Sequence, residues 1–283
     1  MRYKFSLSTT AFFLSTLVYL SGCTKKISLL PPSSNIPCRI SLITSNVAED
    51  GVLDTLYFTY NAAGNISFIK QSLILDAGSY EFIYDSDNKL VQYKVLYSEY
   101  NASGWTIFQF PKGNDLPDTD ITYQFPSPDT GSLPPAFYTN LNTTTYHYDF
   151  QKRISQTVTV YADNSGNVAF TTTSNYSYDN RGNLSSPIFS DTSAVRTYDD
   201  KVNFRRLSPV FQFIDRDYSQ NNLTTGIEID SYNQYGLPTH MKNKVTAPQG
   251  AGPLEFLDIG LGECWIQYDC SCGIKTTVSL KDL

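Results

Sequence analysis

The stretch Ser174-Asn175-Tyr176-Ser177-Tyr178-Asp179-Asn180-Arg181-Gly182-Asn183-Leu184 decides the fold of this chain. It reads as a β-strand that ends at Tyr178, a tight turn, and a second strand that restarts at Leu184. Tyr fits the pleated, half-buried surface of a sheet. Asp179 closes the turn by accepting hydrogen bonds from nearby backbone amides, and Gly182 supplies the positive φ of a tight return. The stretch therefore predicts an antiparallel hairpin.

The same phrase recurs along the chain: a Tyr, then Asp or Asn, then turn residues that usually include Gly, then an apolar residue that restarts a strand. The other copies begin at Tyr60-Asn61, Tyr84-Asp85, Tyr100-Asn101, Tyr148-Asp149 and Tyr232-Asn233, with a looser one at Tyr161, Asp163 and Gly166 and a truncated one at Tyr268-Asp269. Their spacing is irregular, which excludes a strict solenoid period. We therefore predict an all-β fold, a curved antiparallel meander of hairpins with about 12–16 strands.

Turn chemistry also explains the acidic residues of these phrases, and a role as cation or sugar ligands is the alternative. Only Asp85-Ser86-Asp87-Asn88 resembles a calcium loop, and it lacks the Gly and the distal Glu that such a loop needs. Of the 27 acidic residues 21 are Asp, which favours turns, whereas Glu favours helices. The net charge is −6 and no long basic run is present, so nucleic acid is not expected as a partner.

Two segments depart from the hairpin pattern. Residues 110–138 carry six Pro residues, and because Pro removes a donor from the ladder we expect a loop there and no central strand. Aromatic residues of this loop are candidates for a binding face, the alternative being a loop packed over the end of the sheet; they are Tyr123, Phe125, Phe137 and Tyr138. Residues 207–217 predict one short helix, because Ser208-Pro209 resembles a helix start and apolar residues follow at helical spacing.

The N-terminus predicts export. A short basic region precedes an apolar run from Phe5 to Leu20, which has the length and flanks of a secretory signal. The ending Leu20-Ser21-Gly22-Cys23 resembles a bacterial lipobox. That resemblance implies that Cys23 is the first mature residue and carries the lipid, the alternative being an ordinary signal peptide with a coincidental Cys.

The expected organisation follows from this anchor. Residues 1–22 are predicted to be a lipoprotein signal peptide, residues 23–37 a tether, and residues 38–283 a single β-rich domain. Thr24 stands where Asp would favour retention in the inner membrane, so an outer-membrane location is expected. Lys25-Lys26 is basic, whereas surface-exported lipoproteins of the Bacteroidota usually carry acidic residues there. The periplasmic and cell-surface faces both stay open.

Four cysteines remain in the predicted mature chain and are disulfide candidates: Cys38, Cys264, Cys270 and Cys272. An even number in an exported chain favours two bridges. A bridge from Cys270 to Cys272 is awkward, because alternate residues of a strand are too far apart for a relaxed bridge. We expect Cys38 to join one of the other three and the remaining two to pair. A four-cysteine zinc site is the alternative, although the spacing lacks the usual paired pattern.

No catalytic residue, metal or cofactor is predicted. The two histidines, His147 and His240, fit ordinary sheet positions, and no nucleophile elbow, zinc-protease motif or P-loop is present. A carboxylate pair for glycoside hydrolysis has no local motif, because the two acids meet only in the fold.

Two resemblances emerge from the repeated phrase. The Tyr-Asp-turn-Gly-Asn-Leu pattern resembles the YD repeats of Rhs-type proteins. The order of lipobox, YD-like hairpins, Tyr198-Asp199-Asp200-Lys201, Ser219-Gln220-Asn221-Asn222 and Tyr235-Gly236-Leu237-Pro238-Thr239 resembles a set of Bacteroidota all-β lipoproteins of unknown function. That set defines no catalytic residues, so none is transferred to this chain.

The sequence thus favours a non-enzymatic lipoprotein of the cell envelope, held to the membrane by the lipid on Cys23, with a glycan or an envelope protein as its partner. Aromatic residues make up 14% of the chain, and they suit both stacking on sugars and cross-strand packing. The alternatives are a hydrolase acting on polysaccharide or peptidoglycan, and a structural accessory subunit of an envelope complex.

Overall fold

The computed structural model describes residues 36–46, 53–72, 79–98, 101–129, 140–163, 165–185, 195–243 and 263–270. The predicted signal peptide and nearly all of the predicted tether lie outside these ranges. The strands are β1 (Arg39–Asn46), β2 (Asp54–Tyr60), β3 (Ile66–Gln71), β4 (Ser79–Tyr84), β5 (Leu90–Ser98), β6 (Asn101–Gln109), β7 (Thr119–Asp129), β8 (Asn140–Tyr148), β9 (Ile154–Asp163), β10 (Val168–Asn175), β11 (Tyr198–Val202), β12 (Asn221–Leu223), β13 (Ile227–Tyr232), β14 (Pro238–Asn243) and β15 (Glu263–Asp269). The helices are the 3-10 helix η1 (Phe204–Leu207) and α1 (Pro209–Asp215).

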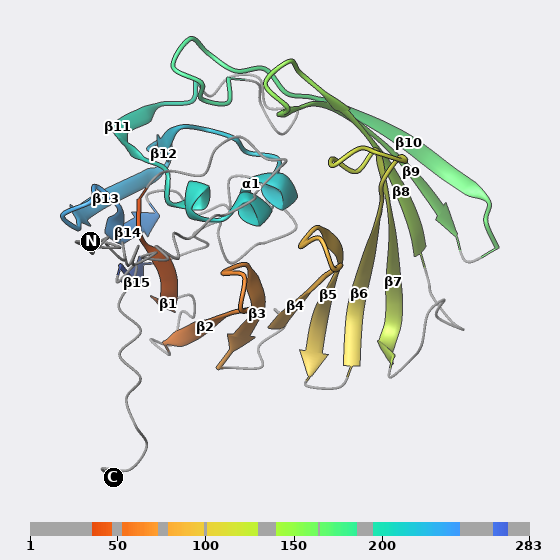
Figure 1. Cartoon of the computed structure of the whole chain (residues 1–283), viewed down its shortest axis with the longest axis horizontal. Coiled ribbons are helices and arrows are strands. Elements are labelled where there is room, and N and C mark those ends of the chain that lie inside the picture. The colour runs from red at the N-terminus through yellow and green to blue at the C-terminus, as the bar shows by residue number, and fades with distance from the viewer. Residues whose placement is uncertain are drawn as a thin grey trace, which may run out of the picture.

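Thirteen strands form a single sheet in the order β10-β9-β8-β7-β6-β5-β4-β3-β2-β1-β15-β14-β13. From β1 to β10 the spatial order follows the chain, and neighbouring strands pair antiparallel. The sheet curves into an arch, and α1 lies on its concave side (Figure 1). The prediction of an all-β curved meander with one short helix is confirmed.

The repeated Asp or Asn closes each turn in the same way. Its Oδ1 accepts hydrogen bonds of 2.8–3.1 Å from the backbone N–H groups two and four residues further on. The residue three positions after it has a positive φ, which explains why Gly is usual there. The turns begin at Asn61, Asp85, Asp149, Asp163, Asp179 and Asn233, and the positive-φ residues are Gly64, Asn88, Lys152, Gly166, Gly182 and Gly236.

Several of the repeated Tyr residues tie their hairpins to an earlier part of the chain. The hydroxyl of Tyr84 donates to the Ile66 carbonyl at 2.7 Å, and Ile66 is the apolar residue that restarts the preceding hairpin. Tyr178 reaches Ile154 in the same way at 3.4 Å. The other pairs are Tyr60 to Ile40, Tyr148 to Pro117, Tyr198 to Leu184 and Tyr268 to Pro238. The phrase therefore specifies contacts between hairpins as well as the turn itself.

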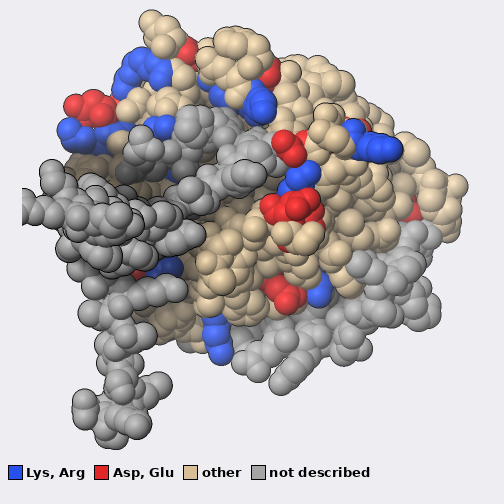
Figure 2. All heavy atoms as spheres, in the orientation of Figure 1, with Lys and Arg blue, Asp and Glu red and all other residues tan. Residues whose placement is uncertain are grey.

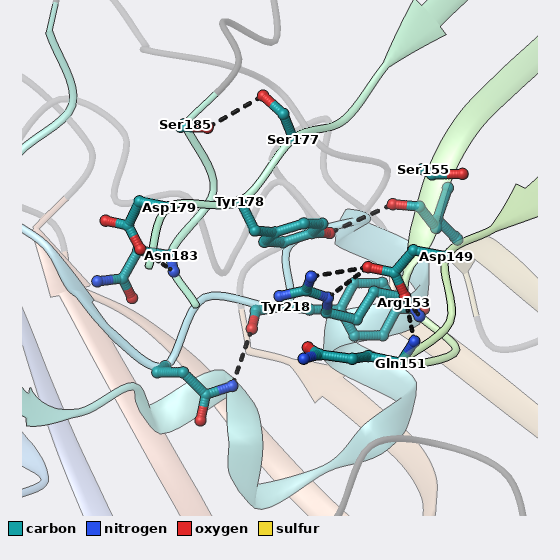
Figure 3. Close-up of polar contacts among 12 residues, drawn as sticks. Asp149, Gln151, Arg153, Ser155, Ser177, Tyr178, Asp179, Asn183, Ser185 and Tyr218 are labelled. Carbon is teal, nitrogen blue, oxygen red and sulfur yellow. Dashed lines mark hydrogen bonds and ion pairs between the residues drawn. The ribbon is translucent and has the colours of Figure 1, made fainter. Parts of the chain in front are cut away.

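Figure 3 shows such a junction between two turns. The guanidinium of Arg153 lies against the ring of Tyr178, with Cζ 3.8 Å from the ring centroid. The same guanidinium is paired with Asp149, Nη2 to Oδ2 at 2.7 Å. A cation held between a carboxylate and an aromatic face is favourable, so the junction links the Asp149 turn to the Asp179 turn.

The interior is closed by the chain between β11 and β12, which crosses the concave side of the sheet. Phe211 and Tyr218 are fully buried there. Arg205 and Asp215 form a buried ion pair, Nε to Oδ2 at 3.0 Å, that joins η1 to the end of α1. Because α1 has only seven residues, packing against the sheet rather than helix propensity holds it in place.

Two local predictions are wrong. The Pro-rich segment contains β7, a central strand between β6 and β8. Its part that is paired on both sides is Thr119–Gln124, which has no Pro, and Pro126 and Pro128 fall beyond it. Asn101 and Gly104 lie inside β6 rather than in a turn, and Gly104 pairs with Val95.

Candidate binding pocket on the concave face

The inward face of the sheet changes character along the arch. Strands β2 to β5 turn buried apolar side chains inward, among them Phe58, Ile69 and Phe82. Strands β7 to β9 turn polar side chains inward, and Thr144, Thr157 and Thr159 are buried there. Burying a hydroxyl costs free energy unless it finds a hydrogen-bond partner. The polar interior of the second half therefore needs an explanation that packing alone does not give.

The inward polar residues surround a cavity of about 220 Å³. Residues of α1 and its C-terminal cap close it opposite the sheet, since Phe213 lies between Phe108 and Tyr146 with centroid distances of 5.3 Å to each. The cavity is lined by Tyr93, Phe108, Asp120, Thr122, Gln124, Asn142, Thr144, Tyr146, Thr159, Tyr161, Phe213, Ile214 and Arg216. We call this set the concave pocket.

Asp120 is the only carboxylate among the described residues that line the concave pocket. It is buried, and the Tyr146 hydroxyl donates a hydrogen bond to its Oδ2. Thr122 Oγ1 lies 3.4 Å from its Oδ1. Burial raises the pKa of Asp120 above its ordinary value, although the hydrogen bond from Tyr146 and the charge of Arg216 act in the opposite direction.

Arg216 supplies the positive charge of the concave pocket from the C-terminal cap of α1. Its φ of 56° is left-handed, and its backbone N–H donates to the Phe213 carbonyl at 3.2 Å, which ends the helix. Burial lowers the pKa of Arg216, but its neighbours Tyr146, Tyr176 and Asp120 raise it by more. The guanidinium therefore stays charged beside Asp120.

Three of the pocket-lining side chains are hydroxyls in short pairs. Thr144 and Thr159 are 3.2 Å apart between their Oγ1 atoms, and Thr122 lies 2.8 Å from Thr106, a buried neighbour on β6 outside the lining. Among the described residues the buried Oδ1 of Asn142 has no hydrogen-bond partner. An unsatisfied acceptor in a cavity wall is costly unless a ligand or water completes it, so this atom marks a position where a donor would bind.

An aromatic platform adjoins the concave pocket. Tyr161 on β9 and Phe170 on β10 are cross-strand partners with ring centroids 4.3 Å apart and planes inclined by 18°. Tyr161 lines the pocket, whereas Phe170 is 55% exposed. The platform gives the rim of the pocket an apolar face beside its polar floor.

The sequence predicted a different binding face, on aromatic residues of the Pro-rich segment. Tyr123 pairs with Trp105 and Leu141, and the alternation along β7 turns Tyr123 and Phe125 to the face opposite Thr122 and Gln124. Phe137 and Tyr138 lie outside the described residues. The pocket residues went unrecognised because they are spread over strands β5 to β9 and α1, and they come together only through the register of the sheet. The available signal was the Thr-rich composition of β8 to β10.

A second polar cluster lies on β13 to β15. His240 lies between Asp230 and Glu263, with Nδ1 to Oδ2 at 3.2 Å and Nε2 to Oε2 at 3.4 Å. Its ring stacks on Trp265 at 5.0 Å between centroids. Lys242 also contacts both acids, at 2.9 Å and 3.4 Å. The side chains of this cluster therefore contact one another across the three strands. His147 is exposed on β8, as expected for a sheet histidine whose side chain points opposite to that of Tyr146.

The disulfide prediction is partly corrected. Cys38 is joined to Cys270, which links the start of β1 to the end of β15. Cys264 has a free and buried thiol, so the expected second bridge does not involve it, and Cys272 lies outside the described residues. Burial raises the pKa of the Cys264 thiol to about 12. Cys264 points into the apolar core beside Met241, its pairing partner on β14, where a thiol packs as a small apolar group.

On the face drawn in Figure 2, charge is spread thinly over the described residues. Figure 2 shows acidic and basic side chains in small groups separated by uncharged surface on the face it draws. Within the described ranges no group of three or more His, Cys, Asp or Glu is arranged to hold a metal ion. None of the described helices has the length and apolar character to cross a membrane.

Comparisons with known proteins add little to this geometry. No protein-family model matches the chain, and no curated protein matches it. Among solved structures, one match is a chain of the Tc holotoxin pore of Photorhabdus luminescens, with 13% sequence identity and a TM-score of 0.21. The match covers 71% of this chain but 12% of the toxin chain. A TM-score of this size does not establish a common fold.

Proposed function

We propose that the protein is a non-enzymatic, lipid-anchored module of the bacterial cell envelope that binds one sugar unit of a glycan in the concave pocket. The observation that carries this proposal is the switch from apolar to polar side chains on the inward face around an open cavity. Apolar side chains fill the equivalent positions of the first half of the sheet, so the fold does not require polar ones.

The chemistry of the pocket matches a hydroxyl-rich ligand. Sugars present hydroxyl groups that donate and accept hydrogen bonds, together with apolar ring faces that pack on aromatic side chains. Asn142, Gln124 and Arg216 offer amide and guanidinium groups, and Tyr161 offers an aromatic face. The volume of about 220 Å³ lies below the roughly 300–1,000 Å³ usual for drug-sized ligands, which favours a single small unit.

The envelope location rests on the lipobox-like sequence and the proposed lipid on Cys23. An exported chain agrees with the disulfide between Cys38 and Cys270, since such bridges persist in oxidising compartments. Protease treatment of intact cells distinguishes the two possible faces. Release of its peptides from intact cells would place the domain on the outer surface, and protection until the outer membrane is opened would place it in the periplasm.

A polysaccharide hydrolase is the alternative function. Hydrolysis by the common mechanism uses two carboxyl groups about 5–10 Å apart in one cleft. Asp120 is the single acid among the described lining residues, and Tyr146 and Arg216 already engage it. These contacts favour binding over turnover. Release of reducing sugar that is abolished by Asp120→Asn would reverse this order.

The test of the proposed function is calorimetric titration of the full chain, carrying Cys23→Ser to prevent lipidation, with a panel of monosaccharides and their short oligomers. Asn142→Val removes the unpartnered acceptor and should weaken binding about tenfold or more. Thr143→Val is the matched control, because residue 143 lies next to it on the opposite face of β8 and its substitution should leave affinity unchanged. Equal affinities of the two variants, or no binding by any sugar, would refute the proposal.

A further inference from the structure

The two edges of the sheet are protected very differently. β10 and β13 are the edge strands and lie at opposite ends of the arch (Figure 1). β13 carries Glu228 and Asp230, and its pairing with β14 is irregular at Ile229/Ser231 and Ser231/Tyr232. Charges and bulges of this kind prevent an edge from pairing with another strand. β10 reads VAFTTTSN, with no charge and no Pro.

The outer backbone groups of β10 are available for pairing. Tyr176 N–H donates to the Ser155 carbonyl at 2.8 Å, and Asn175 is the direct partner of Gln156. In an antiparallel ladder, backbone groups point alternately toward and away from the neighbouring strand. The N–H and C=O groups of Thr171, Thr173 and Asn175 therefore point away from β9. No described strand lies on that side of β10.

We propose that this edge binds the β10 strand of a second copy of the chain, antiparallel and about a two-fold axis, so that two arches join into one continuous sheet. The strand suits pairing with itself, because it has no charge that would face a like charge across the axis. Its three consecutive Thr residues are β-branched and favour extended backbone.

A strand from a different protein is the competing occupant. Domains that capture foreign strands select them through pockets for alternate side chains. β10 presents small hydroxyl side chains at Thr171, Thr172 and Thr173, all exposed, which offer no such pocket. Pairing with a second copy needs only matched backbone groups. Antiparallel partners that lie opposite each other share a face, so the platforms at Phe170 of both copies would open onto the same concave surface.

The test is sedimentation velocity of the full chain carrying Cys23→Ser, over a range of concentrations. Thr173→Pro removes an outward N–H and should raise the dimer dissociation constant about tenfold or more, because each dimer loses two donors. Thr173→Val keeps the N–H and the extended backbone, and it should dimerise like the starting protein. Thr173→Lys places like charges at the new interface and should also give monomers.

The folded state is checked by the urea midpoint, which should be close to that of the starting protein for Thr173→Lys even if the Pro variant is weakened. A starting protein that is monomeric at every concentration would overturn the proposal. Dimers that persist in both Thr173→Pro and Thr173→Lys would also overturn it. The readout is mass rather than ligand, so failure here is separate from failure of the sugar-binding proposal.

Discussion

Phe58, Ile69 and Phe82 face the interior from the first half of the sheet, whereas Thr122, Thr144 and Thr159 occupy the inward positions of the second half. The same hairpin builds both halves, and the Asp or Asn of each turn is bonded in the same way. The difference teaches that the repeated phrase specifies strands and turns, while the residues between the phrases decide what each part of the arch encloses. The first half contributes buried apolar side chains to the core, and the second half encloses the concave pocket.

Removal of an apolar side chain should therefore produce the largest loss of stability. Phe211 on α1 is fully buried and packs edge-to-face on Phe58, with centroids 6.2 Å apart. Phe211→Ala should lower the free energy of unfolding in urea by about 3–5 kcal/mol. Thr144→Ala, in the polar half, should cost about 1 kcal/mol for one lost hydrogen bond. Equal losses of unfolding free energy in the two variants would contradict the view that the apolar half contributes more to stability.

Alanine substitution at Gly64 and Gly182 tests whether two turns of the same sequence pattern tolerate a Cβ equally well. Gly64 and Gly182 both have a φ of +81°. A Cβ on Gly64 would meet nothing within 4 Å, whereas one on Gly182 would lie 2.8 Å from Gln220 Cγ. Gly182→Ala should therefore destabilise the protein by about 1–3 kcal/mol and by more than Gly64→Ala, which carries only the backbone strain. Urea midpoints of the two variants give the comparison, and the reverse order would contradict it.

The pH dependence of stability should separate the buried acid of the concave pocket from the acids of the turns. The pKa of Asp120 is raised in the folded protein, mainly by burial. Its favourable contribution is thus fully present below the ordinary Asp pKa and is lost as the pH rises through the raised value. Asp120→Asn should remove this loss, so the variant gains stability relative to the original protein as the pH rises above about 4.

Asp163 is the control with the opposite sign. Hydrogen bonds from Asn167 lower the pKa of this exposed turn residue. Its contribution is present above the ordinary pKa and is lost as the pH falls through the lowered value. The free energy of unfolding of Asp163→Asn should therefore approach that of the original protein only at acidic pH. The measurement is urea unfolding of Asp120→Asn and Asp163→Asn from pH 3 to pH 7. The same change of stability with pH in both variants would contradict this account.

The smallest effect on stability is expected at the aromatic platform. Phe170 is 55% exposed and Val168, on the same strand, is 62% exposed. Both changes to Ala should alter the free energy of unfolding by no more than about 0.5 kcal/mol. Phe170→Ala should nevertheless weaken sugar binding about three- to tenfold, since it removes half of the stack on Tyr161. Val168→Ala, outside the stack, should not, and equal effects of the two changes would remove the platform from the site.

Much of the fold could be predicted because its signals are local. At Asp179 the preceding Tyr and the Gly three residues later identify the turn correctly, since the bonds involved span only four residues. The copy at Asn101 and Gly104, which lies inside β6, shows that the same local pattern can be overridden by strand pairing. The helix near 207–217 was also predictable from Ser208-Pro209 and the apolar spacing that follows. β7 was missed because its Pro residues fall beyond the part of the strand that is paired on both sides, and that boundary depends on the neighbouring strands.

The sequence by itself determined that this chain folds as a meander of hairpins, because turn and strand chemistry acts over a few residues. Only the tertiary structure decided which Thr and Asn side chains face the interior together, since they come from different strands and meet through register. It also placed Arg216 opposite Asp120 and joined Cys38 to Cys270 across a separation of 232 residues. Such contacts depend on how far the sheet curves, and that curvature is a sum over all its strands.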